Sequence, residues 1–249
     1  MKKTVLMLAA CAGPVFTAPA FAGGSNYGIV PGALPQVQGK VTEWPVPTPK
    51  FARDPAPGPD GNLYIAVMSG NRIARFDTKT KTFKEWDLPD GARPHGLLVD
   101  SDGIVWYTGN GNGTIGRLDP ATGQITHLDT GSGSRPRRVA TAPDGMLWVT
   151  LYGNGKLIKV DPQARRIVKE YAMPHGRGAG PYAVTVDAAG RVWANEIDTD
   201  TVAILDPKTE AFRVIALPSK NTGIRKAIVD AQGRFWYMGS HNGKLGVIE

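Results

Sequence analysis

The chain repeats one sequence unit five times. The units begin at residues 59, 101, 143, 188 and 231 and read PDGNLYIAVMSGNRIARFD, SDGIVWYTGNGNGTIGRLD, PDGMLWVTLYGNGKLIKVD, AAGRVWANEIDTDTVAILD and AQGRFWYMGSHNGKLGVIE. Each unit has a turn, an aromatic residue and a closing apolar segment in step with the others. The aromatic residues follow one another at steps of 42, 42, 45 and 43 residues, and they are Tyr64, Trp106, Trp148, Trp193 and Trp236. A period of this length is typical of β-propeller blades with four strands each.

Each unit divides into four expected strands. In the second unit, PHGLLVD (94–100) reads as a buried inner strand, and Asp102-Gly103 forms the turn to IVWYT (104–108). TIGRLD (114–119) and the outer strand QITHL (124–128) complete the unit. The composition agrees, because 31 glycines and 20 prolines favour turns over long helices. We therefore predict an all-β fold, a β-propeller of five four-stranded antiparallel blades.

The ends of the repeat region predict how the ring closes. The last unit stops after its third strand, and VTEWPVP (41–47) resembles the outer strand FKEWDLP (83–89) of the first unit. We expect residues 41–47 to complete the last blade, because this would cover an exposed sheet edge. The first inner strand carries Pro55, Pro57 and Pro59, which cannot donate to a ladder. Either that blade is irregular or the ring closes differently.

The first 22 residues read as a signal peptide. Lys2 and Lys3 precede the apolar stretch TVLMLAACAGPVF, and Ala20-Phe21-Ala22 forms a small-x-small cleavage site. A lipoprotein signal ending at Cys11 is the alternative. Residues 23–40 are expected to be a flexible segment, and residues 41–249 a single propeller domain. We expect a periplasmic or secreted protein, which has no cysteine for a disulfide or thiolate metal site once Cys11 is removed.

The charge pattern excludes some partners. The chain has 29 Lys and Arg against 22 Asp and Glu, a formal net charge of +7. These basic residues are spread along the chain and do not form the aromatic-interleaved stripe of nucleic-acid readers. After the leader, no apolar run approaches membrane-spanning length, so no transmembrane segment is expected.

One position in each unit is expected to face the central channel. It lies eight residues before the turn glycine, at the start of the inner strand, where side chains from all blades converge on one mouth of a propeller. Its occupants are Arg53, His95, Arg137, Tyr182 and Arg225. A position that varies while its scaffold repeats is where function is expected.

This cationic rim allows two interpretations. Arg93, Arg135 and Arg138 lie close to it in sequence, and together they predict a site for an anionic small molecule, a glycan or a protein segment. In the alternative, the arginines pair with Asp54, Glu196 or backbone carbonyls and only plug the channel.

The repeated sequence pattern resembles that of the streptogramin B lyase (virginiamycin B lyase) family of propellers. Its elements are Pro-x-[Gly/Ala]-[apolar], Asp-Gly-x-[Leu/Val]-Trp, Gly-Asn-x-Ile-x-Arg-[apolar]-Asp and Glu-[Trp/Tyr]-x-[apolar]-Pro, and the resemblance covers roughly residues 41–249. Known members of this family have seven blades, which is two more than the five repeats here. It also implies an elimination that opens a cyclic depsipeptide ester. In that reaction a general base removes the proton α to the carbonyl, and Mg²⁺ polarises the carbonyl.

The family site matches this chain only in part. The Arg-Pro-His segment is present as Arg93-Pro94-His95, so the resemblance makes His95 the candidate catalytic residue. In the next unit Arg135-Pro136-Arg137 stands where the family has Glu-Pro-His, and arginine is a poor base. Glu196, three residues after Trp193, is the carboxylate nearest a family-like position. The sequence therefore shows no Mg²⁺ ligand set. The resemblance predicts weak or altered lyase activity on an ester-containing molecule, and the alternative is a binding propeller without catalysis.

Overall fold

The computed structural model describes residues 42–249. The predicted signal peptide (1–22) and flexible segment (23–40) lie outside the described residues. Residues 42–249 form strands and one short 3-10 helix, η1 (Gly176–Ala179), which confirms the all-β prediction. No helix in this part of the chain is long and apolar enough to cross a membrane.

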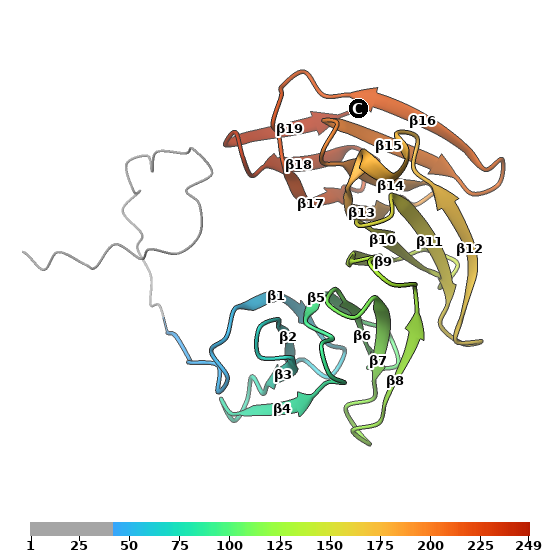
Figure 1. The fold of residues 1–249 in the computed structure, drawn as a ribbon. Coiled ribbons are helices and arrows are strands. Elements are labelled where there is room, and N and C mark those ends of the chain that lie inside the picture. The colour runs from blue at the N-terminus through green and yellow to red at the C-terminus, as the bar shows by residue number, and fades with distance from the viewer. Residues whose placement is uncertain (1–41) are drawn as a thin grey trace, which may run out of the picture.

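Five antiparallel sheets stand round a common axis as blades (Figure 1). The first consists of β1 (Ala52–Pro57), β2 (Leu63–Val67), β3 (Arg72–Phe76) and β4 (Phe83–Asp87). The second consists of β5 (Pro94–Val99), β6 (Val105–Gly109), β7 (Thr114–Leu118) and β8 (Ile125–Asp129). The third consists of β9 (Pro136–Thr141), β10 (Leu147–Leu151), β11 (Lys156–Asp161) and β12 (Arg166–Ala172). The fourth consists of β13 (Pro181–Val186), β14 (Val192–Glu196), β15 (Thr201–Asp206) and β16 (Ala211–Ala216). The fifth consists of β17 (Ile224–Val229), β18 (Phe235–Gly239) and β19 (Lys244–Ile248).

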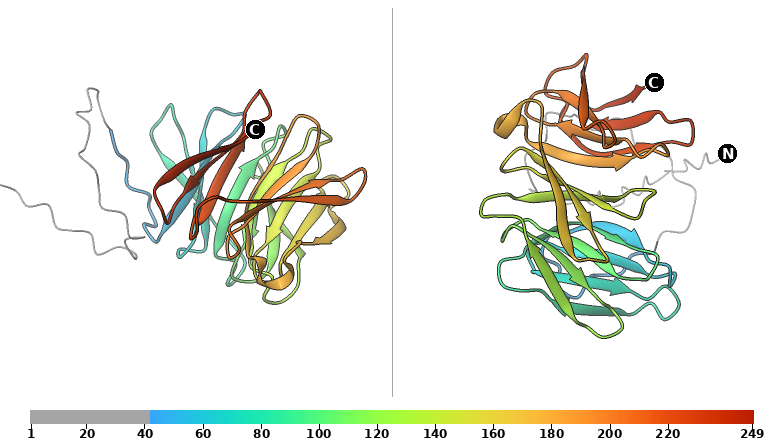
Figure 2. Two further views of the ribbon diagram at one scale, coloured as in Figure 1. Left: turned by 90° about the horizontal axis from the view of Figure 1, so that it is seen from above. Right: turned by 90° about the vertical axis from the view of Figure 1, so that its right-hand side faces the viewer.

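The strands of every blade follow one another in chain order from the axis outward. The inner strands β1, β5, β9, β13 and β17 pack on their neighbours in that sequence. Figure 2 shows the blades from two further sides. The predicted five-bladed propeller is therefore confirmed.

The predicted closure of the ring is wrong. The last blade has three strands, in the order β17-β18-β19, and residues 42–47 form no strand. They lie instead against the first blade, where the Trp44 ring packs on Phe76 with centroids 5.0 Å apart. Thr48 continues this contact, because its backbone N–H and its hydroxyl donate to the Glu85 carboxylate at 3.1 and 2.7 Å.

The physical reason for the different placement lies in the prolines and the tryptophan. Pro45 and Pro47 have no N–H, so this segment could donate few hydrogen bonds to the edge of β19. Phe76 faces away from the second blade, since side chains alternate along a strand and Ile73 packs toward that blade. No other blade of residues 42–249 packs on the face of the first blade that holds Phe76. The Trp44 ring covers part of the apolar surface of that face.

The irregularity predicted for the first inner strand is present and is shared by all blades. In β1 the register with β2 shifts between Arg53 and Pro55, and Asp54 has a positive φ of 28°. The other four inner strands shift register at the corresponding place. The break is thus a property of the repeat, and the prolines of β1 are accommodated beside it.

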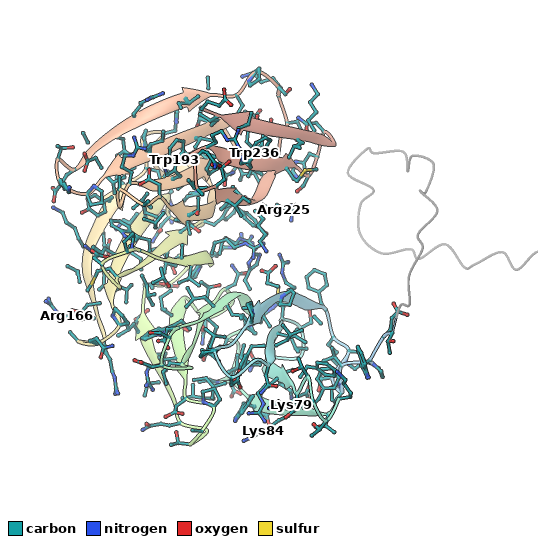
Figure 3. All side chains as sticks on the ribbon, turned by 180° about the vertical axis from the view of Figure 1, so that it is seen from behind. Lys79, Lys84, Arg166, Trp193, Arg225 and Trp236 are labelled. Carbon is teal, nitrogen blue, oxygen red and sulfur yellow. The ribbon has the colours of Figure 1, made fainter. Side chains whose placement is uncertain are left out.

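Three of the four repeated tryptophans pack against the following blade. Trp106 joins Leu147 and Val149 of the following blade in one buried cluster. Trp193 stacks on Phe235 with centroids 5.4 Å apart and the planes tilted by 13°, and Figure 3 labels Trp193 and Trp236 in the last two blades. A fully buried large apolar side chain contributes about 1.5–3 kcal/mol. These interfaces hold the inner strands, and therefore their first residues, in fixed relative positions.

Candidate functional site

The axis-facing positions sit where each inner strand breaks its register. In the second blade the ladder shifts between Pro94 and Leu97, a stretch that contains His95. Arg53, Arg137, Tyr182 and Arg225 lie at the matching breaks of the other blades. A bulge of this kind bends the strand and re-aims a side chain. The repeat therefore turns one side chain per blade away from the sheet.

In three of the blades, a polar residue of the second strand holds the break in place through hydrogen bonds. The Thr108 hydroxyl accepts the Gly96 N–H at 2.8 Å and contacts the Arg137 carbonyl of the next blade at 2.9 Å. Thr150 does the same for the third blade and reaches the Tyr182 carbonyl at 2.8 Å. Asn195 spans the fourth and fifth blades through its amide. These bonds join one inner backbone to the next.

Tyr182 is the centre of the cationic mouth. Its hydroxyl accepts a hydrogen bond from Arg53 Nη2 at 3.3 Å. The Arg137 and Arg225 guanidinium carbons lie 5.1 and 5.6 Å from the centre of its ring. Figure 3 shows Arg225 on the axis-facing side of the last blade. The predicted convergence of these positions is thus observed, with three arginines round one ring.

His95 lies beneath this group and is fully buried, with 0% of its surface exposed. Its Nδ1 is 3.1 Å from the Arg137 carbonyl oxygen, which can only accept, so Nδ1 carries the proton. Nε2 then accepts from the Tyr182 hydroxyl at 2.8 Å. Burial, followed by repulsion from Arg53, Arg137 and Arg138, lowers the pKa of His95 to about 2. Both ring nitrogens are engaged, and the imidazole stays neutral.

Arg137 packs against two aromatic rings. Its guanidinium carbon is 4.7 Å from the centre of the Tyr152 ring and 5.1 Å from that of Tyr182, and the two rings stand edge to face with centroids 6.4 Å apart. Arg135 also lies over Tyr152, at 5.5 Å. Desolvation lowers the pKa of Arg137, which means that burial disfavours its charge. Within residues 42–249, the buried Nε atoms of Arg137 and Arg53 have no hydrogen-bond partner.

A pocket of about 460 Å³ opens above these side chains. Its lining contains the arginines and tyrosines together with Asp198 and Asp200 from the loop after β14. The Asp200 carboxylate accepts the backbone N–H groups of Asn221 and Thr222 at 2.8 and 2.7 Å. Desolvation raises the pKa of Asp198, although a hydrogen bond from Tyr152 opposes the shift. The complete lining is Arg53, Arg137, Tyr152, Tyr182, Ile197, Asp198, Asp200, Asn221, Arg225 and His241.

Sequence reasoning missed six of these ten lining residues. Tyr152, Asp198 and His241 stand four or five residues after the aromatic residue of their units. In an antiparallel blade the loop after the second strand returns to the end where the inner strand begins. That topological rule would have placed these loop residues at the same mouth.

Arg138 closes the channel below the pocket. Its Nη1 pairs with the Asp54 carboxylate of β1, and its Nε donates to the Arg225 carbonyl of β17 at 3.1 Å. Its side chain is 15% exposed and that of Asp54 is 21% exposed. The interpretation of a plug is therefore correct for Arg138. It does not describe Arg53 or Arg137, which form no salt bridge within residues 42–249.

Arg93 and Arg135, which were expected close to the rim, and Glu196, the carboxylate nearest a family-like position, do not line the pocket. Arg93 is exposed on the second blade, and its backbone N–H donates to Asn71. Glu196 is 0% exposed, and its carboxylate accepts the His175 backbone N–H and the Thr201 hydroxyl and contacts His175 Nδ1 at 2.6 Å. It therefore anchors the loop between the third and fourth blades.

Residues 32–249 match the model of the virginiamycin B lyase family. The chain belongs to the virginiamycin B lyase family. Among curated proteins none is significantly similar to it in sequence.

Solved structures share the propeller of this family member. Virginiamycin B lyase from Staphylococcus aureus is 24% identical, with a TM-score of 0.78 over 85% of this chain and 71% of that chain. A catalytically inactive variant of that lyase with quinupristin is 22% identical, with a TM-score of 0.78 over 86% and 72%. An auxiliary nutrient binding protein from Bacteroides thetaiotaomicron is 13% identical, with a TM-score of 0.61 over 80% and 59%. At these identities the likeness shows the fold alone.

The Mg²⁺ that the virginiamycin B lyase resemblance implies does not fit the residues of this mouth. Arg135 and Arg137 stand where the family has a carboxylate and an imidazole, and guanidinium groups cannot ligate a cation. The Glu196 carboxylate is already occupied by protein donors. In the part of the chain that the structure describes, no three His, Cys, Asp or Glu residues gather closely enough to hold a metal ion. The mouth is lined by three arginines and two tyrosines together with the carboxylates of Asp198 and Asp200.

Proposed function

We propose that this family member is an exported binding propeller that takes an anionic small molecule at the axial mouth. The observation that carries the proposal is Arg137, a desolvated cation held by two tyrosine rings without an acidic partner in residues 42–249. Arg53 and Arg225 approach the same Tyr182 ring. Like charges repel in a desolvated pocket, and a bound anion relieves that repulsion. The leader-like segment 1–22 supports export.

The chemistry of the site favours a carboxylate or phosphate. Arginine presents a planar fork that bonds such groups through paired, charge-assisted hydrogen bonds. Each bond of this kind is worth about 1.5–3 kcal/mol net. The proposed ligand is therefore a small carboxylate- or phosphate-bearing metabolite or glycan, and its binding weakens as salt screens the attraction.

Thermal unfolding with added phosphate or citrate tests this proposal. At a ligand concentration 100-fold above Kd, mass action adds about 2.7 kcal/mol, which corresponds to about 5–10 °C in Tm for a domain of this size. Arg137→Ala is expected to lose most of this shift while the Tm of the free protein changes little. Arg166→Ala is the matched control, because Arg166 is exposed at the periphery (Figure 3) and should leave the shift intact.

Two outcomes would contradict the proposal. In the first, neither anion raises the Tm of the parent protein. In the second, Arg137→Ala by itself strongly lowers the Tm of the free protein, which would make the arginines a structural plug.

An ester-opening lyase is the second candidate function. Family membership and the Arg93-Pro94-His95 match favour it. Against it, His95 is buried with both nitrogens engaged, and the partner positions are arginines. A general base must reach the proton it removes. Mass spectrometry of a streptogramin B antibiotic, incubated with the protein and Mg²⁺, is expected to show no ring opening. Turnover that EDTA and His95→Ala both abolish would restore the lyase.

A further inference from the structure

In three blades, the turn between the first and second strands contains the same set of hydrogen bonds. This turn lies at the end of the blades opposite the arginines. Asp100 Oδ2 accepts the indole N–H of Trp106 at 2.9 Å. The same bond joins Asp187 to Trp193 at 3.0 Å and Asp230 to Trp236 at 2.8 Å. In all three turns, Oδ1 of the aspartate accepts the backbone N–H groups two and four residues further on.

The third blade lacks this aspartate. Ala142 stands three residues before its turn glycine, at the position of Asp100 in the second blade. The tryptophan keeps its place, because Trp148 pairs with Ala140 in the register that Trp106 has with Leu98. Within residues 42–249 the Trp148 indole N–H makes no hydrogen bond to replace the missing one. Trp148 Nε1 is not among the enclosed side-chain atoms without a partner in the described residues, so the indole N–H is open to solvent or to a ligand at the position of the missing carboxylate.

A pocket occupies the vacated position. It has a volume of about 310 Å³, and its lining consists of Ala142, Pro143, Asp144, Trp148, Lys159, Ala188, Ala189, Gly190, Pro207 and Lys208. Most of these residues are apolar. The charged ones are Asp144, which pairs with Lys159 at 2.9 Å, and Lys208. Two ammonium groups against one carboxylate leave the rim with one net positive charge.

We propose that this pocket binds a small monocarboxylate with an apolar body, such as an aryl or short aliphatic acid. The ligand carboxylate takes the place of the absent aspartate side chain and accepts the Trp148 indole N–H. Lys208 supplies the charge that Asp144 and Lys159 do not cancel between themselves. The apolar body lies on the alanines and prolines of the third and fourth blades. This site is separate from the axial mouth, which lies at the other end of the strands.

The indole N–H resonances of the tryptophans provide a site-specific test in the whole protein. Trp148→Phe identifies the Trp148 signal by its disappearance. Titration with benzoate is expected to shift this signal at millimolar concentration, whereas neutral benzamide of the same shape is expected to bind at least tenfold more weakly. Repeating the titration in Arg137→Ala separates this pocket from the axial mouth, because the shift should persist.

Ala142→Asp restores the repeat and gives the sharper comparison. It is expected to raise the Tm by a few degrees without ligand, to move the Trp148 signal, and to abolish the benzoate shift. Ala164→Asp makes the same change of charge in an exposed turn of the same blade and should leave benzoate binding intact. If Ala142→Asp does not fold, thermal unfolding with benzoate is the test. Benzoate is expected to raise the Tm of the parent protein and to leave the Tm of Trp148→Phe unchanged. A Trp148 signal that ignores benzoate, or that responds equally in Ala142→Asp, overturns the proposal.

Discussion

Replacing Arg138 by leucine is expected to destabilise the protein by about 2–4 kcal/mol, because it leaves the largely buried Asp54 carboxylate without its partner. The same change removes the bond to the Arg225 carbonyl. Arg138 belongs to the third blade, Asp54 to the first and Arg225 to the fifth. One side chain therefore links the third blade to both the first and the fifth, and its loss weakens contacts among three blades at once.

Chemical denaturation measures this effect as a lower unfolding midpoint. The double variant Arg138→Leu with Asp54→Leu is expected to recover part of the loss, because it removes the unpaired charge along with its partner. Arg166→Leu is the matched control and should change stability by less than about 0.5 kcal/mol, since Arg166 is exposed. If Arg138→Leu behaves like that control, the tie contributes nothing to stability.

Acidification from pH 7 to pH 5 is expected to cost about 2 kcal/mol through His95 alone. The pKa of His95 is about 2 in the folded protein and near its ordinary value of 6.5 in the unfolded chain. Between those values the unfolded chain binds a proton that the folded protein does not, so stability falls as the pH falls below 6.5. The loss is complete only near pH 2. His95 therefore adds no positive charge to the mouth at pH 6.

His95→Gln isolates this contribution. A glutamine amide can donate to the Arg137 carbonyl and accept from the Tyr182 hydroxyl without titrating. The free energy of unfolding, measured by chemical denaturation, should therefore change less between pH 7 and pH 5 in the variant than in the parent, by about 2 kcal/mol. Equal pH dependence in the two proteins would mean that His95 is protonated in the fold.

The sequence predicted the blades and the axis-facing positions because both are periodic. Five turns, five aromatic residues and one position per inner strand repeat in step, and Arg53, Arg137, Tyr182 and Arg225 meet as that period requires. What failed was not periodic. Trp44 packs on the face of the first blade rather than at the edge of the last one, which is a packing preference that similarity to FKEWDLP does not report.

The same limit applies inside the candidate site. His95 occupies a rim position in sequence, yet the tautomer and burial that make it inert depend on Tyr182, 87 residues away. Glu196 matched a family position, but His175 and Thr201 occupy its carboxylate. Asp198 and His241 reach the pocket through loop geometry. These roles are set by which groups meet in space, and no spacing rule along the chain encodes such meetings.

The bonds of Thr108, Thr150 and Asn195 make the mouth unusually open to redesign. They run from one inner backbone to the next and do not involve the side chains at the axis-facing positions. The scaffold is therefore indifferent to what those positions hold, with the exception of the coupled pair His95 and Tyr182. Arg53, Arg137 and Arg225 can be exchanged one at a time at little cost to the frame. Selection, natural or in the laboratory, can thus change the side chains of the mouth without altering the propeller itself.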